Sequence, residues 1–402
     1  MKQQSFQLKE PQLSALPAIT LPILGICGPS GAGKTTLIEA MLPELVQRGL
    51  RVAVVKHDCR HLLVDMPGKD SDRLYRAGAD VFLLGGEEFA PQGHFLRGAR
   101  LHGDAGASFG FQLSQLARRY DLVLVEGHGQ TPVPKVWLLA DDGAGPQGMD
   151  VPPVPLVPEM DVIAPSADVD VDGNAVLRVF PRGEARAAQV FDFLLQWLQE
   201  IWIQAPVWAC VLIGGRSSRM GRPKHLLEKE ASTAGFTWLE HTVGLLQPLI
   251  GDHIALSGGG LVPESLAHLP RLPDIPEVRG PLTGILAAMR WQPAVSWLLI
   301  ACDMPDISTE ALAWLLAQRQ PGYWGTVPRL QENGYVEPLL AHYDYRCGPL
   351  FEELLASGSL RIGQIARQSK IETPLIPLLL RSAWHNINTP QELARSRQVR
   401  PV

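Results

Sequence analysis

The sequence predicts an α/β protein of two domains, each built on a largely parallel β-sheet. Short, nearly continuous apolar runs, which are typical of buried strands, alternate with amphipathic stretches along most of the 402 residues. This alternation begins again directly after Gln204-Ala-Pro206. A glycine-rich loop follows the first apolar run of each half, where open α/β sheets bind ligands. We therefore expect a flexible lead-in over residues 1–20, a first domain over 21–203 and a second over 207–402.

The expected elements of the first half follow from apolar periodicity and from helix-ending residues such as Gly49. Between about 141 and 183 the chain is rich in Gly, Pro and Asp, which predicts loops and short edge strands. The expected strands are 23–27, 52–56, 121–126 and 136–139, and the expected helices are 35–48 and 187–201.

The second half repeats the same alternation without repeating the loop chemistry of the first. The expected strands are 208–213, 254–257, 297–302 and 339–343, and the expected helices are 237–249, 282–291 and 309–319.

The first glycine-rich loop carries the phosphate-binding pattern G-x-x-x-x-G-K-[ST], between a strand and a helix as this motif requires. Its glycines let backbone N–H groups point at phosphate oxygens, and the helix N-terminus adds a positive end. Lys34 is expected to reach the β/γ-phosphates, and the Thr35 hydroxyl to complete a Mg²⁺ shell. The residues predicted to bind a nucleoside triphosphate are Gly28, Pro29, Ser30, Gly31, Ala32, Gly33, Lys34, Thr35 and Thr36.

Two acidic features of the first half could serve that site. Glu126 ends an apolar strand, where we expect the acid to hold Mg²⁺ directly or through water; a solvated strand end is the less favoured alternative. The polar turn 65–71 could approach a γ-phosphate as a switch-like loop, or could be a plain surface turn.

The second glycine-rich loop is basic and is not a P-loop. The run ending in Leu212 and Ile213 leads into Gly214, Gly215, Arg219 and Lys224, which could surround a polyphosphate. Asp303 ends another buried strand and is placed to hold Mg²⁺ against that nucleotide, unless it merely begins a turn.

Two further segments of the second half could contact ligands. The tight loop 280–284 opens a helix and could carry a base or ribose through its backbone. Asn386 and Asn388 offer amide oxygens to a metal or substrate, and capping of a helix by Asn388 or Thr389 is the alternative.

Composition excludes several classes of function. A net charge of −5 gives no basic excess for nucleic-acid binding, and no apolar run approaches the length of a membrane span. The 5 cysteines include no C-x-x-C pair and the N-terminus has no signal-peptide core, so we expect a cytoplasmic protein.

These motifs resemble two known families, one in each half. The second half, about 206–402, is similar to the molybdenum cofactor guanylyltransferases, through the Leu212–Gly221 string with Lys224, the 280–284 loop, Cys302-Asp303-x-Pro305, 337–339 and 386–390. The first half, about 20–203, is similar to the adaptor GTPase of molybdopterin guanine dinucleotide synthesis, through the P-loop, Lys56-His57, Asp65, 68–71, 77–79 and 125–127. The chain therefore resembles a natural fusion, with an N-terminal P-loop NTPase sheet and a C-terminal Rossmann-like nucleotidyltransferase sheet.

The resemblance implies roles for single residues of the second half. Asp303 would bind both GTP and Mg²⁺, and Asp274 would contact the nucleotide; Leu212, Ile213, Gly214 and Lys224 would bind GTP. The family usually has alanine where Ile213 stands, and it tends to place an asparagine after the second strand, where this chain reads Leu256-Ser-Gly-Gly-Gly260.

The expected reaction is transfer of GMP from GTP to the terminal phosphate of molybdenum-bound molybdopterin, with release of pyrophosphate. Asp303, Arg219 and Lys224 would stabilise the developing charge. The first half would hydrolyse GTP slowly, or use its GTP-binding state to assist cofactor handover. Molybdoenzymes or their chaperones are the expected protein partners, and a homodimer through the first domain is conceivable. The rival hypotheses are a GTP-regulated carrier or insertion chaperone of the cofactor, and a transferase that uses CTP or a sugar phosphate.

Overall fold

The computed structural model describes residues 21–57, 68–84, 94–96, 109–127, 129, 133–140, 176–213, 220–229, 235–332 and 334–398. The chain divides into two compact units, one over Leu21–Ile203 and one over Gln204–Arg319 and Tyr323–Val402. The expected lead-in, residues 1–20, lies outside the described residues.

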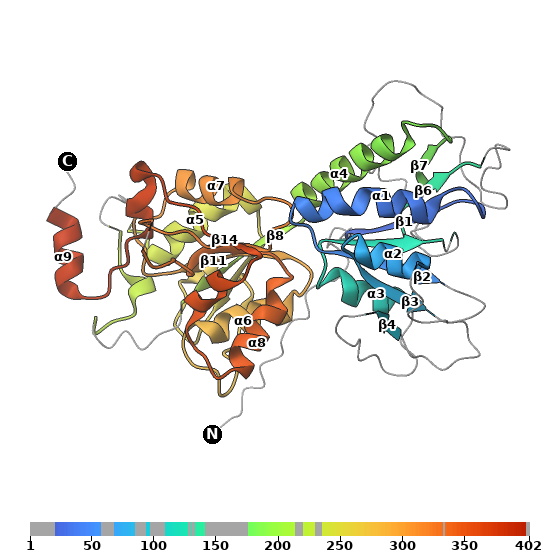
Figure 1. Ribbon diagram of the computed structural model, residues 1–402. Coiled ribbons are helices and arrows are strands. Elements are labelled where there is room, and N and C mark those ends of the chain that lie inside the picture. The colour runs from blue at the N-terminus through green and yellow to red at the C-terminus, as the bar shows by residue number, and fades with distance from the viewer. Residues whose placement is uncertain are drawn as a thin grey trace. The chain divides into compact units, whose positions relative to one another are not determined.

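The first unit alternates strands and helices around one sheet (Figure 1). Its elements are β1 (Ile23–Cys27), α1 (Lys34–Gln47), β2 (Val52–His57), α2 (Asp70–Arg76), β3 (Asp80–Leu84), β4 (His94–Leu96), α3 (Phe109–Ala117), β5 (Leu122–Glu126), β6 (Lys135–Leu138), β7 (Val176–Phe180) and α4 (Arg186–Gln204).

The sheet of the first unit has the order β4-β3-β2-β5-β1-β6-β7, and all its pairs are parallel except β3 with β4. Alternate side chains of each strand point to opposite faces of the sheet, and helices pack on both faces. Leu24 and Ile26 pack under α1, α2 and α4, whereas Ile23 and Val55 pack against α3. Figure 1 shows α1 and α4 on one side of the strands and α3 on the other.

The second unit is also an α/β sandwich. Its elements are β8 (Val207–Leu212), the 3-10 helix η2 (Lys224–Leu226), α5 (Trp238–Ile250), β9 (Ile254–Ser257), η3 (Glu264–Leu266), β10 (Arg271–Leu272), α6 (Pro281–Trp291), β11 (Ser296–Ala301), α7 (Thr309–Ala317), β12 (Gly325–Thr326), β13 (Leu340–Tyr343), α8 (Cys347–Ala356), η4 (Ile362–Arg367), β14 (Ile371–Glu372), η5 (Leu378–Trp384) and α9 (Pro390–Gln398).

The strand order of the second sheet is β10-β9-β8-β11-β13-β12-β14, in which β13 alone among the described strands runs against its neighbours. Cys210 and Leu212 pack beneath α6 and α8, while Val211 and Ile300 pack beneath α5 and α7. The expectation of two α/β sheets is therefore confirmed, with one antiparallel strand in each.

A membrane span requires a helix of sufficient length and apolarity. Within the described ranges, no helix is long and apolar enough to cross a bilayer.

Candidate functional site

The P-loop of the first unit has a backbone that only glycine can adopt at its first position. Gly28 has φ 146°, and a Cβ there would lie 2.4 Å from the carbonyl oxygen of Leu138. Gly31 and Gly33 also have positive φ values, of 80° and 85°, so the loop curls directly into α1. Lys34 lies over this loop, with Nζ donating to the carbonyls of Gly28 and Pro29 at 2.9 Å each.

A buried arginine from α4 ties the P-loop to the rest of the unit. The Arg186 guanidinium donates to the carbonyls of Ala32 and Leu139 at 2.8 Å each, and to Pro181 at 2.6 Å. Three segments are thus fixed by one side chain. No motif marks Arg186, so it was not among the residues predicted from the sequence.

Thr35 and Glu126 meet at the carboxyl end of β5. The Thr35 hydroxyl donates to Glu126 Oε1 at 2.5 Å, and Glu126 itself is buried. Its other oxygen, Oε2, accepts no hydrogen bond from any described residue, although Lys56 Nζ lies 3.7 Å away. A buried carboxylate with an oxygen available beside a threonine hydroxyl fits a Mg²⁺ site, since Mg²⁺ takes oxygen ligands.

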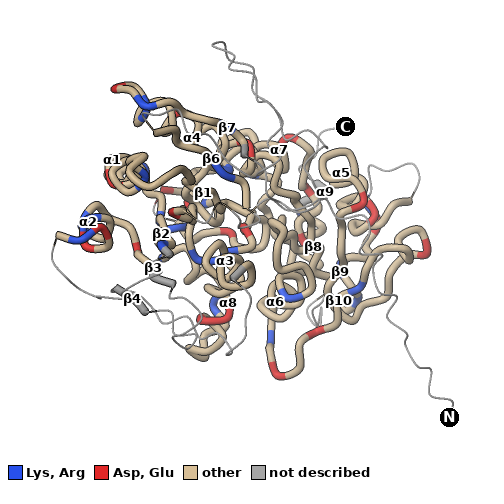
Figure 2. The backbone as a smooth tube through the Cα atoms, turned by 90° about the vertical axis from the view of Figure 1, so that its right-hand side faces the viewer, with Lys and Arg blue, Asp and Glu red and all other residues tan. Residues whose placement is uncertain are grey.

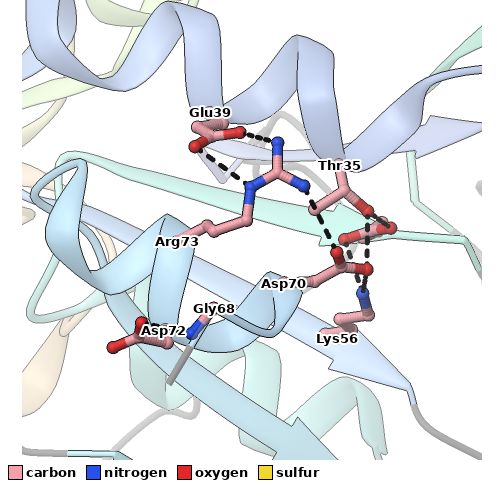
Figure 3. A network of polar contacts seen from close by, with 8 residues as sticks. Thr35, Glu39, Lys56, Gly68, Asp70, Asp72 and Arg73 are labelled. Atoms are coloured by element: carbon pink, nitrogen blue, oxygen red, sulfur yellow. Dashed lines mark hydrogen bonds and ion pairs between the residues drawn. The ribbon is translucent and has the colours of Figure 1, made fainter. Parts of the chain in front are cut away.

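A second carboxylate, Asp70, joins this pair from the start of α2 (Figure 3). Asp70 Oδ2 lies 2.6 Å from Lys56 Nζ and 3.4 Å from Thr35 Oγ1. The hydrogen bond from Lys56 is the largest of the causes that lower the pKa of Asp70 below its ordinary value. The expected turn 65–71 thus places Asp70 beside the P-loop, although Asp65 lies outside the described residues.

Arg73 continues the network from α2 to α1. It binds Glu39 in a two-pronged contact, with Nε 3.2 Å from Oε1, and its Nη1 lies 3.7 Å from Asp70 Oδ1. Figure 2 shows both signs of charge together on α2. These contacts, Glu39–Arg73–Asp70–Lys56, therefore connect α1 through α2 to the carboxyl end of β2, beside the P-loop.

The second unit gathers its polar residues at the carboxyl edge of its parallel strands. Leu212 pairs with both Ser257 and Ala301, and Ser257 pairs with Leu272, so four strands end in one aligned row. Asp303 follows this row by two residues after β11, and exposed Asp274 follows it by two residues after β10. Leu212 and Ile213 are buried, and the Ile213 N–H donates to Ser257 at 2.9 Å.

Lys224, Asp303 and Asn388 meet at this edge. Lys224 Nζ lies 3.1 Å from Asp303 Oδ2 and 2.7 Å from Asn388 Oδ1. Only 14% of the Lys224 side chain and 24% of the Asp303 side chain are exposed. Three distant segments thus bring a cation, an acid and an amide to one place.

The segment 386–389 is held against Asp303, which follows β11, and it contains one side-chain oxygen that has no partner among the described residues. The Ile387 N–H donates to the Asp303 carbonyl at 2.9 Å. Thr389 caps α9, accepting from the Glu392 N–H at 3.2 Å, so the capping alternative holds for Thr389. Asn386 Oδ1 is buried and has no hydrogen-bond partner in the described part of the chain. A buried acceptor without a partner, one residue before the contact with Asp303, fits a site for a hard cation or for a ligand donor.

The start of α6 closes on the same edge. A Cβ at Gly284 would lie 2.5 Å from Leu212 Cδ2 and 2.8 Å from Ser257 Oγ, so the helix approaches the strand ends as closely as glycine permits. The Thr283 hydroxyl accepts from the Ile275 N–H at 2.6 Å, which fixes the segment that carries Asp274.

Glu337 is another acid near this edge. Leu339 accepts from the Ala301 N–H at 2.8 Å, so Glu337 comes just beyond the carboxyl end of β11. Burial raises the pKa of the Glu337 carboxyl above its ordinary value. Glu337 lies within one of the motifs that carry the family resemblance, and no role was predicted for it.

Three of the predicted residues, Gly214, Gly215 and Arg219, lie outside the described residues, between Ile213 and Met220. The structure brings together Lys224, Asp303 and Asn388 in one unit and Lys34, Thr35 and Glu126 in the other. Across the described ranges, no group of three or more His, Cys, Asp or Glu residues could hold a metal alone. A metal at either site would therefore also need substrate or water oxygens.

The comparisons with known proteins match the two halves separately. Residues 23–150 match the family model of molybdopterin guanine dinucleotide synthesis protein B, and residues 209–370 match the MobA-like NTP transferase domain. A molybdopterin-guanine dinucleotide biosynthesis adapter protein of Haemophilus influenzae is 34% identical over 44% of this chain and 90% of its own. A probable molybdenum cofactor guanylyltransferase of Bacillus cereus is 32% identical over 48% of this chain and 96% of its own.

One solved structure can be set beside these relatives. The molybdopterin-guanine dinucleotide biosynthesis protein A of Archaeoglobus fulgidus is 24% identical with a TM-score of 0.39, over 48% of this chain and 97% of that chain. On the strength of the two relatives, the chain belongs to the molybdopterin-guanine dinucleotide biosynthesis adapter family in its first half and to the molybdenum cofactor guanylyltransferase family in its second.

Proposed function

We propose that the second unit transfers GMP from GTP to Mo-molybdopterin and that the first unit is a GTP-binding adapter for the same pathway step. The observation that carries this proposal is the meeting of Lys224, Asp303 and Asn388 at the carboxyl edge of β8 and β11. A cation beside an acid at a strand edge is suited to a metal-bound polyphosphate.

The reaction is an in-line displacement at phosphorus. An oxygen of the acceptor phosphate forms a bond to the α-phosphorus of GTP, the bond between the α-phosphorus and the α/β bridging oxygen breaks, and pyrophosphate leaves with that electron pair. The acceptor oxygen is already ionised, so no strong general base is required.

Each residue would contribute position and charge. Lys224, already held between Asp303 and Asn388, would donate to the triphosphate and to departing pyrophosphate. Asp303 and the orphaned Asn386 oxygen would hold Mg²⁺, which when bound neutralises phosphate charge. The phosphates would be surrounded by Arg219, Gly214 and Gly215. Asp274, which follows β10 two strands away from β8, would contact the nucleoside. Leu212 and Ile213 would form the floor of the site.

The first unit would bind GTP through residues 28–36, with Mg²⁺ held by Thr35 and Glu126 and supported by Asp70. We infer weak GTP hydrolysis there, and contact with recipient molybdoenzymes or their chaperones. A homodimer through this unit is a further proposal, as is independent folding of 21–203 and 207–402. Expressing each fragment alone and measuring its unfolding and its molar mass would test both.

The decisive experiment follows pyrophosphate from the full chain with Mg²⁺, Mo-molybdopterin and each nucleoside triphosphate in turn. Pyrophosphate release with GTP and with no other nucleoside triphosphate, in the presence of Mo-molybdopterin, supports the proposal. Release with CTP would reassign the site to a cytidylyltransferase, and release when a sugar phosphate replaces Mo-molybdopterin would change the acceptor class. Intact GTP binding without pyrophosphate release from any combination of nucleotide and acceptor would favour the cofactor carrier.

A further inference from the structure

The loop after β9, residues 258–261, is held by hydrogen bonds from two basic side chains that belong to other segments. Arg271 Nη2 donates to the carbonyl of Gly258 at 2.8 Å and to that of Gly260 at 2.7 Å. His225, the residue after Lys224, has Nε2 2.8 Å from the carbonyl of Leu261. Three carbonyls of four consecutive residues are thus held by side chains.

The loop sequence is fitted to this arrangement. Gly258 has φ 123°, which side chains rarely adopt, and a Cβ at Gly260 would lie 2.6 Å from His225 Cε1. At Gly259, by contrast, φ is ordinary and no atom lies within 4 Å of the added Cβ. The middle of the loop therefore has open space in front of it, while its two flanks are constrained.

Holding the carbonyls sets the direction of the amides. The described part of the chain contains no cis peptide bond, and in a trans peptide the C=O of one residue and the N–H of the next point in opposite directions. The N–H groups of Gly259 and Leu261 therefore point away from Arg271. Neither donates to any described residue.

The sheet shows what lies in that direction. Arg271 pairs with Leu256, so both side chains project from the same face. On the other face α6 reaches Leu212 and Ser257 at the strand ends. The two amides thus point away from the Arg271 guanidinium. The loop itself lies beside the end of β8, since a Cβ at Gly260 would be 3.5 Å from the carbonyl oxygen of Ile213. Because β9 and Asp303 lie on opposite sides of β8, the loop belongs to the nucleoside side of the site.

We propose that Arg271 and His225 are positioning residues, which hold the Gly259 and Leu261 amides as donors to the nucleoside half of GTP. The inference rests on the proposed function for the identity of the nucleotide. It assigns Arg271 no contact with substrate.

The test uses the full chain in a Lys34→Ala background, so that binding at the P-loop does not obscure the second site. Arg271→Met keeps the aliphatic stem and loses both hydrogen bonds that Nη2 donates. We expect the KM and the dissociation constant for GTP to rise about ten-fold, with kcat within about two-fold, because two hydrogen bonds that order the loop are lost far from the α-phosphorus. Binding of inorganic tripolyphosphate should be unchanged. Arg271→Lys should recover part of the GTP affinity.

The matched pair Gly259→Ala and Gly244→Ala separates positioning from folding. Gly259→Ala places a methyl group in the open space in front of the loop and should weaken GTP binding. Gly244 is exposed on α5, and a Cβ added there also has no atom within 4 Å, so the Gly244→Ala protein should bind GTP as tightly as the background protein. His225→Gln, which retains a donor, should bind GTP better than His225→Phe.

Unchanged GTP affinity in both Arg271→Met and Gly259→Ala would overturn the inference, as would an equal loss of tripolyphosphate binding. If Arg271→Met does not fold, as judged by thermal unfolding, Gly259→Ala decides. Failure of the proposed function is distinguishable: the parent chain, with Lys34 intact, would then release no pyrophosphate from GTP and Mo-molybdopterin, while the binding measurements still test the loop.

Discussion

Lys224 and Asp303 are in direct contact at the carboxyl edge of the second sheet, with Nζ 3.1 Å from Oδ2, although 79 residues separate them in the sequence. The same ammonium donates to Asn388, so it is held between two acceptors. Such a lysine would need little reorganisation if a phosphate oxygen replaced one of these two acceptors, which is the property expected of a preorganised electrostatic catalyst.

Replacing Asp303 with asparagine should reduce pyrophosphate release about a thousand-fold or more, because the neutral amide cannot hold a divalent cation against the phosphates. The rate should be measured across a Mg²⁺ titration. The isosteric side chain keeps the contact with Lys224 possible, so circular dichroism should be unchanged. A rate within ten-fold of the parent would contradict the assignment.

The contact between Lys224 and Asn388 should appear as non-additivity. Lys224→Met should cost about a hundred-fold in rate, and Asn388→Ala a smaller factor, because it only orients the lysine. In the double variant, Asn388→Ala should add little to the loss caused by Lys224→Met, with a coupling of about 1 kcal/mol. Steady-state kinetics of the four proteins measure this coupling, and simple additivity would show that the two residues act separately.

The chain should bind GTP at two sites, and replacing a single lysine should remove one of them. Lys34→Ala should lower the stoichiometry from two GTP per chain to one, because the P-loop loses its phosphate cation. Isothermal titration calorimetry gives the stoichiometry. Exposed Arg119 of the same unit offers the control, since it lies just before the amino end of β5 and Arg119→Ala removes a positive charge at the opposite edge of the sheet from the P-loop. An unchanged stoichiometry in Lys34→Ala would show that the P-loop does not bind the nucleotide.

Two P-loop glycines should differ in their tolerance of alanine. Gly28→Ala should destabilise the first unit by roughly 3 kcal/mol, because the new Cβ meets the Leu138 carbonyl at 2.4 Å as well as an unfavourable φ. Gly31 also has a positive φ, but a Cβ added there has no atom within 4 Å, so Gly31→Ala should lower the free energy of unfolding by only about 1–2 kcal/mol. Urea unfolding curves compare them, and equal losses would mean that the Leu138 carbonyl can move aside.

Glu337 should make stability depend on pH. Burial raises the pKa of this carboxyl in the folded protein above its ordinary 4.5, so its ionisation costs stability at all pH values above the raised pKa, and this cost disappears as the pH falls below 4.5. Glu337→Gln should therefore raise the Tm of the second unit by about 2 °C at pH 8 and have no effect at pH 4. Exposed Glu332→Gln is the control, and a gain at pH 4 would show that burial of the charged carboxylate is not the cause.

The sequence predicted the elements that have long apolar runs. β1 and β9 have the predicted bounds, because their apolar residues are bounded by clear breaks. It did not predict α2, β3 or α3, whose short segments have weak periodicity, nor two-residue strands such as β10. Pairing with a neighbouring strand defines such short strands, since two residues are too few to show the alternation that marks a strand in a sequence.

The candidate sites were predictable where a motif ends a strand. Asp303 and Glu126 were found in this way, because parallel strands finish at a common edge. The contact of Lys224 with Asn388 could not be predicted, because it joins residues 164 positions apart through the path of the last segment. Arg186 and Arg271 act on backbone carbonyls, which any sequence supplies, so no pattern of side chains identifies them.

The single guanidinium of Arg186 has a practical consequence for dissecting this chain. The match to the family model of synthesis protein B stops at residue 150, yet the carbonyl of Ala32 in the P-loop accepts a hydrogen bond from a side chain 36 positions further on, at 186. A fragment trimmed to the family limit would lose that fastening together with β7 and α4. Guanine nucleotide affinity measured on so short a piece would understate what the intact protein can do.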